Sequence, residues 1–162
     1  MPFNKVIVAE FEPGFIDAYK GEDKLYMLLT YMDKKNFWIA DMNVLGSQRI
    51  NRNTKVKKLS FLPDRLFKAV MKSSPGWAEI VYFNSIKQEG LFNKRDYLLA
   101  WVFAIIQRQY GFALDIALRG KEKFSDSIFV KMENYATAKI KFGMFNIPFF
   151  YSKIIFERIF NR

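Results

Sequence analysis

The chain has 162 residues, 51% of them hydrophobic and 26% charged, a composition that supplies a folded core and disfavours disorder. It contains no Cys and no His, which excludes disulfides, Cys-His and Ser-His-Asp nucleophilic sites and any ordinary zinc site. The formal net charge of +10 makes a polyanion the expected partner.

The beginning of the chain predicts β structure. Residues 3–11 are rich in β-branched and aromatic side chains and predict a strand, which a turn at residues 12–14 ends. Residues 25–32 and 37–42 are two apolar runs on either side of four turn-forming residues, 33–36. This arrangement predicts a β-hairpin.

Most of the net positive charge lies in one stretch, residues 46–72. It holds eight cations against a single acid, Asp64, and therefore carries +7 of the formal +10. Charge concentrated in this way produces a directional field that suits the phosphates of a nucleic acid. The predicted nucleic-acid-binding residues are Arg49, Arg52, Lys55, Lys57, Lys58, Arg65, Lys68 and Lys72.

The first half of this stretch lacks apolar periodicity and predicts an exposed loop, with residues 55–59 as an edge strand in which lysines discourage strand pairing. A helix is predicted over residues 63–72, because Pro63 suits a first turn and Asp64 complements the helix dipole. Helical spacing predicts a buried stripe made of Leu62, Leu66, Phe67, Val70 and Met71. The same spacing places Arg65, Lys68 and Lys72 on one exposed face.

The second half of the chain predicts two further helices and three strands. Residues 77–83 predict a strand, and residues 96–109 a helix that is apolar on nearly every side, capped by Asn93 with Asp96 and ended by Gly111. Residues 127–133 and 135–142 predict a pair of strands, the second with clear alternation. Residues 148–161 predict an amphipathic C-terminal helix.

These elements predict the α+β class: a single compact domain over residues 1–162, with mostly antiparallel strands and about three helices (63–72, 96–109 and 148–161). A division into two lobes near residue 60 is the alternative. The longest apolar run is about half of what a bilayer crossing requires, and the N-terminal apolar run is too short for a signal peptide. We therefore expect a cytoplasmic protein without integral membrane insertion.

The charge pattern predicts a DNA-binding protein, non-specific or weakly sequence-specific, that contacts the phosphate backbone in an architectural or regulatory role. Ser47, Asn51, Asn53 and Thr54 add neutral donors that suit phosphate oxygens. Duplex DNA is favoured over RNA or single strands. Stacking of bases on Phe61, Trp38 or Tyr31 is the alternative that single strands would use. The composition, basic and heavy in Lys, Ile, Phe and Asn without His or Cys, is common in AT-rich genomes, and small phage or mobile-element regulators are among such proteins.

Two other classes of function stay open. In the first, Trp101, Phe103 and the C-terminal helix form a protein-interaction surface, such as a homodimer interface, and the charge is incidental; that helix could also lie on a membrane surface. The second is a Mg²⁺-dependent nuclease, because Asp64 and Glu79 resemble the start of such a signature. The lysine that the signature requires is replaced by Val81. We therefore predict no enzymatic activity, no catalytic residue, no metal site and no cofactor.

Overall fold

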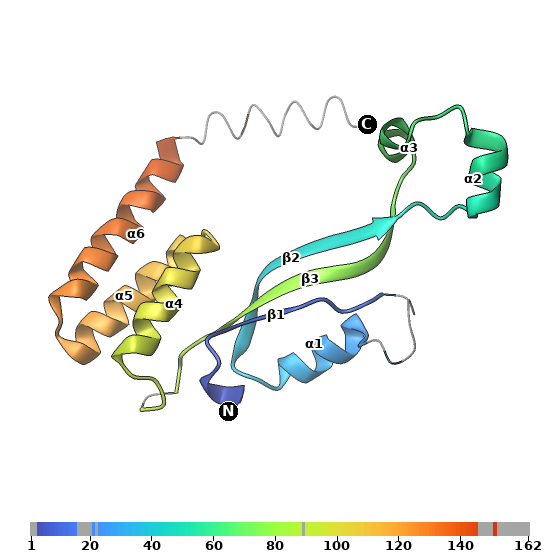
Figure 1. Cartoon of the computed structure of the whole chain (residues 1–162). Helices are drawn as coiled ribbons and strands as arrows, with labels where there is room; N and C mark the ends of the chain where they lie inside the picture. The colour runs from blue at the N-terminus through green and yellow to red at the C-terminus, as the bar shows by residue number, and fades with distance from the viewer. Residues whose placement is uncertain (1–2, 16–20, 22, 89, 146–150, 152–162) are drawn as a thin grey trace. The chain divides into compact units, whose positions relative to one another are not determined.

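The computed structural model describes residues 3–15, 21, 23–88, 90–145 and 151, and these residues form a three-stranded antiparallel sheet and six α-helices (Figure 1). The α+β class and the antiparallel pairing are confirmed, whereas the expectation of about three helices is wrong. The chain divides into two compact units, Met1–Lys87 and Gln88–Arg162. Residue 60, near which the alternative of two lobes places their boundary, lies inside the first unit. That the whole chain forms one domain stays a prediction.

The sheet belongs to the first unit and has the strand order β1-β3-β2. β3 (Ser74–Asn84) is the central strand, and it pairs antiparallel with β1 (Val8–Phe11) on one side and β2 (Phe37–Ser47) on the other. The strand predicted at residues 77–83 is therefore confirmed. β1 begins later than predicted because Phe3–Lys5 form a short 3-10 helix.

The hairpin predicted from residues 25–42 is wrong, because its first half is the helix α1 (Leu25–Asp33). Leu25, Leu28 and Met32 follow helical spacing and pack on the core of the first unit, against Ala78, Ile80 and Tyr82 of β3. The second half is β2, whose partner is β3. The apolar run that suggested a strand thus forms a helix, because it covers the sheet instead of extending it.

The second unit consists of three helices in the described residues: α4 (Lys94–Ile106), α5 (Tyr110–Phe124) and α6 (Ser127–Phe145). The predicted cap of α4 is confirmed. The Asn93 side chain accepts a hydrogen bond from the Asp96 backbone N–H at 3.1 Å, and the Asp96 carboxylate accepts one from the Asn93 backbone N–H at 2.8 Å. The end of α4 was predicted wrongly, because Gly111 lies inside α5 and the chain turns earlier, at Arg108, which has φ +57°.

The strand pair predicted at residues 127–142 is also wrong, because these residues lie within the single helix α6. Phe129, Met132 and Ala136 are its buried residues, and their i, i+3, i+7 spacing defines the face that packs. The alternation does not describe the burial, since Ala138 is exposed. The C-terminal helix predicted at 148–161 lies outside the described residues apart from Tyr151, which is helical and exposed.

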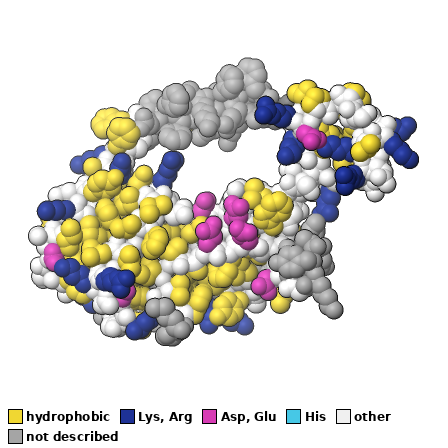
Figure 2. Space-filling view, in the orientation of Figure 1, with side chains coloured by type: hydrophobic (Ala, Val, Ile, Leu, Met, Phe, Trp, Pro, Cys, Tyr) yellow, Lys and Arg dark blue, Asp and Glu magenta, His cyan; other side chains and the backbone are white. Residues whose placement is uncertain are grey.

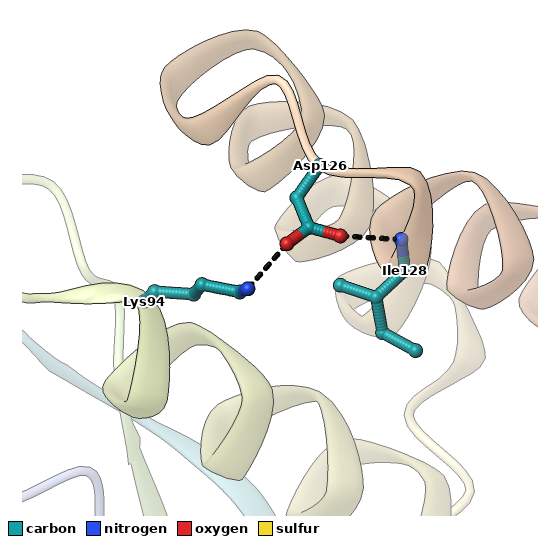
Figure 3. A network of polar contacts seen from close by, with 3 residues as sticks. All are labelled: Lys94, Asp126 and Ile128. Atoms are coloured by element: carbon teal, nitrogen blue, oxygen red, sulfur yellow. Dashed lines mark hydrogen bonds and ion pairs between the residues drawn. The ribbon is translucent and has the colours of Figure 1, made fainter.

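One polar network links the beginnings of α4 and α6 (Figure 3). Asp126, directly before α6, accepts a hydrogen bond from the Ile128 backbone N–H at 2.8 Å and forms an ion pair with Lys94 of α4. The Ile128 N–H, and then Lys94, lower the pKa of Asp126 from its ordinary value. Asp126 therefore caps α6 as a carboxylate. None of the helices in the described part of the chain has the length and apolar character needed to cross a membrane.

Candidate nucleic-acid interface

All eight predicted binding residues lie between the paired ends of β2 and β3. Ser47 pairs with Ser74, and residues 48–73 connect them; we call this segment the basic tip. The approach of the strands is close at this point, because a Cβ added to Gly46 would lie 1.9 Å from the Ser74 carbonyl oxygen. The Gln48 side chain donates to the Met71 carbonyl oxygen at 3.4 Å. The cations are therefore carried by a segment that starts and ends at the same point of the sheet.

The first half of the basic tip contains the helix α2 (Arg52–Leu59), so the prediction of a loop followed by an edge strand is wrong. The helix begins at Asn51, whose side chain accepts a hydrogen bond from the Asn53 backbone N–H at 2.8 Å. Lys57 and Lys58 occupy the last turn, where cations complement the helix dipole. Capping and charge define this helix, and for this reason a search for apolar periodicity missed it.

The helix predicted at residues 63–72 is confirmed in a shorter form, α3 (Asp64–Val70). Pro63 precedes it, and Met71 is already extended, so Lys72 lies beyond the helix and the predicted face of three cations does not form. The predicted buried stripe is wrong as well. Phe67 is buried, while Leu66 and Val70 are exposed. Leu62 is half-buried, and Met71 is exposed.

Lys55 has a structural position in the basic tip. Its amino nitrogen lies 2.7 Å from the Asp64 Oδ1 atom and 4.2 Å from the centre of the Phe67 ring. The hydrogen bond from Lys55, its charge and the charge of Lys68 lower the pKa of Asp64. Lys55 therefore connects α2 to α3, and its charge is committed to the carboxylate of the tip itself.

The other seven cations differ from Lys55 because all of them are exposed. In the part of the chain that the structure describes, none of the seven forms an ion pair with a carboxylate. Figure 2 shows Lys and Arg side chains gathered over the segment that carries α2 and α3. The seven are Arg49, Arg52, Lys57, Lys58, Arg65, Lys68 and Lys72.

The three aromatic residues considered for base stacking lie in different surroundings. Trp38 of β2 stacks on Phe83 at 5.7 Å, and the Tyr31 ring of α1 meets the edge of Phe3 at 6.1 Å. Phe61 lies in the connector between α2 and α3, within the basic tip, and is 76% exposed. Of the three, the structure thus places Phe61 in the same segment as the cations.

The acids proposed for the nuclease alternative have other partners. Lys55 pairs with Asp64, and the Asn43 side chain donates to the Glu79 carboxylate at 3.5 Å. Within the described residues no group of three or more acids is placed to hold a metal ion. That the protein is not an enzyme stays a prediction.

A cavity of about 400 Å³ lies in the first unit, between α1 and the segment that follows β1. Phe11, Met27 and Leu28 give it an apolar wall, and the residues that line it include the acids Glu12 and Asp23. Acids disfavour an anionic ligand at this position. The described lining of the cavity therefore gives no support to the binding of a polyanion there.

Comparison of the chain with protein-family models, with curated proteins and with solved structures gave no match.

Proposed function

We propose that the protein binds DNA through the phosphate backbone, without strong sequence specificity, and that its role is architectural or regulatory. One observation carries this proposal: seven exposed cations without a carboxylate partner among the described residues occupy a single segment of 26 residues, the basic tip. Like charges at this density repel each other, and a bound polyanion relieves the repulsion. Release of the counterions condensed on DNA adds to the affinity.

The side chains of the tip support contact with phosphates better than reading of bases. Sequence-specific recognition requires Arg, Asn or Gln held in a fixed position within a groove. Asn51 is already used as the cap of α2, and Arg49 precedes that helix. The long cations on two short helices can instead reach phosphates in many arrangements.

The test is a titration of random-sequence DNA with the full chain at several salt concentrations. Fluorescence anisotropy of the labelled DNA measures the binding. If all seven cations neutralise phosphates, the logarithm of the affinity falls with the logarithm of the salt concentration at a slope of about −6. A slope near zero contradicts the proposal.

A charge-reversed variant tests the surface itself. The variant Lys57→Glu, Lys58→Glu, Arg65→Glu changes three exposed cations of the tip and leaves Lys55 in place, because Lys55 supports Asp64 and Phe67. We expect a loss of affinity of more than about 100-fold at low salt.

The matched control reverses three exposed lysines elsewhere in the same unit. Lys5, Lys34 and Lys87 lie outside the basic tip, and their change to Glu alters the net charge by the same amount. This control should retain most of the affinity. Equal losses in the two variants would mean that binding follows net charge and has no defined surface.

A second function, protein interaction, has an observation in its favour. Val102, Phe103 and Ile106 of α4 are exposed, and their spacing places them on one side of the helix. Exposed apolar side chains that gather on one face suit a protein partner. If this face forms a homodimer, the double variant Val102→Glu, Ile106→Glu should convert a dimer into a monomer in analytical ultracentrifugation. An unchanged mass of the variant removes this role for α4.

A further inference from the structure

Phosphate binding does not explain why the ring of Phe61 in the basic tip is 76% exposed. We infer that Phe61 is a stacking platform for an unpaired base, so that the tip holds single-stranded nucleic acid more tightly than duplex. This inference rests on the proposed function, because it assumes that the cations bind the phosphates. It adds the class of nucleic acid that the tip prefers.

The position of Phe61 suits this role. It lies in the connector where α2 ends and α3 has not begun, and a backbone hydrogen bond from the Leu62 N–H to the Leu59 carbonyl oxygen, 3.0 Å long, closes the turn. Phe61 makes no ring or cation contact with any described residue. Its ring is therefore presented on a short turn and remains available to a ligand.

The second Phe of the tip shows the contrast. Phe67 is 2% exposed and lies beneath the amino group of Lys55, whereas Phe61 is 76% exposed. Phe has no polar group that water could solvate, so an exposed ring gains free energy when an apolar surface covers it. Phe67 is therefore the buried ring of the tip, and Phe61 stays exposed.

Cations lie on both sides of Phe61 in the chain. Lys57 and Lys58 end α2 before it, and Arg65 lies in the first turns of α3 after it. A strand whose phosphates meet both helices would bring its bases to the connector. In a duplex the bases already stack on each other, whereas a single strand offers a free base. One such contact is worth roughly a 5- to 150-fold gain in affinity.

An anionic membrane surface is the competing occupant, because Val56, Leu66 and Val70 are also exposed. Helices that bind a bilayer interface carry a continuous apolar face. α2 has eight residues and exposes one apolar side chain, Val56, while α3 has seven residues. These short helices, with cations between their apolar side chains, fit a charged polymer better than a bilayer.

The experiment compares side chains of similar size and different shape at position 61. Phe61→Leu keeps an apolar side chain without a ring, and Phe61→Trp keeps the ring. Leu66→Ala is the matched control, because it truncates an exposed apolar residue of the same tip. Each full-length variant is titrated with an oligothymidylate of about 20 nucleotides, with a duplex of equal length, and with vesicles of phosphatidylglycerol and phosphatidylcholine.

We expect Phe61→Leu to weaken binding of the single strand roughly 5- to 150-fold while binding of the duplex changes little. Phe61→Trp and Leu66→Ala should bind the single strand as the unaltered chain does or, for Trp, more tightly. Thermal unfolding should be the same for all, because both positions are exposed.

Three results overturn the inference. Equal binding of the single strand by Phe61→Leu and the unaltered chain removes the stacking contact. Equal losses on single strand and duplex show that Phe61 shapes the tip and does not stack. Vesicle binding that Leu66→Ala and Phe61→Leu both weaken, with no change on the single strand, assigns the exposed side chains to a bilayer. If the unaltered chain binds neither nucleic acid, the proposed function itself fails, which is a different result from these three.

Discussion

The basic tip and the helical second unit differ in how many side chains each of them buries. In the tip, whose residues are all described, one side chain is buried, Phe67. The helices α4 to α6 bury many side chains that contact each other across the unit. They are Tyr97, Ala100, Ala104, Ala113, Ile116, Ala117, Phe129, Met132 and Ala136. Repulsion among the seven cations therefore destabilises the basic tip itself and not the larger cores of the molecule.

The largest contrast is expected between truncations of one buried Phe in each region. Phe129→Ala should lower the free energy of unfolding by about 3–5 kcal/mol, because this ring is fully buried between α5 and α6. Phe67→Ala should open the tip and leave the rest folded. The measurement is thermal unfolding together with hydrogen exchange of the amides, with fast exchange confined to residues 52–70 in the Phe67 variant. A main transition lowered equally by both variants would contradict local stability of the tip.

A smaller effect is expected at two glycines of α5. A Cβ at Gly120 would lie 2.3 Å from the Phe129 ring, so Gly120→Ala should cost about 1–3 kcal/mol through overpacking. Gly111 is the matched control, because a Cβ there meets nothing within 4 Å. Gly111→Ala should be neutral or stabilise the helix by up to about 1 kcal/mol. Equal unfolding temperatures for the two variants would show that the ring moves aside without cost.

The predictions from the sequence were most accurate for features that depend on residues close together in the chain. The capping box at Asn93 and Asp96 and the start of α3 at Pro63 were both found, because each depends on residues that are neighbours in the chain. The strands predicted within α6 and the hairpin predicted at α1 were wrong for a different reason. Short apolar runs suit both a strand and a buried helix face, and packing against distant residues decides between them.

The site shows the same limit. The sequence located the eight cations, and the structure places all of them in one segment. It did not show that Lys55 differs from its neighbours, because its partners Asp64 and Phe67 are nine and twelve residues away on another helix. The sequence also did not show that Phe61 is exposed, because this depends on whether Phe61 or Phe67 is buried in the small core of the tip.

Asp64 of the basic tip and Asp126 of the second unit should respond differently to added salt. The pKa values of Asp64 and Asp126 both lie below the ordinary 3.8. The stability that each carboxylate adds to the folded state is therefore fully present above that pH, and it is lost as the pH falls through the lowered folded-state pKa. Asp64 depends on the cations Lys55 and Lys68, whereas a backbone N–H, that of Ile128, is the main cause at Asp126. Added salt should therefore raise the pKa of Asp64 more than that of Asp126 in an NMR titration. Equal salt responses would contradict this assignment of causes.

The smallest effect, and the one that joins stability to binding, is expected for Asp64→Asn. The amide can still accept a hydrogen bond from Lys55 but no longer neutralises it, so the eighth cation of the tip becomes available to a polyanion. The salt dependence of DNA binding should then steepen by about one unit, from roughly −6 to −7. Asp126→Asn is the control, because it removes the same charge from the other unit and should leave the slope unchanged. If both variants steepen the slope equally, the DNA responds to net charge, and the pairing of Lys55 with Asp64 has no part in setting the strength of binding.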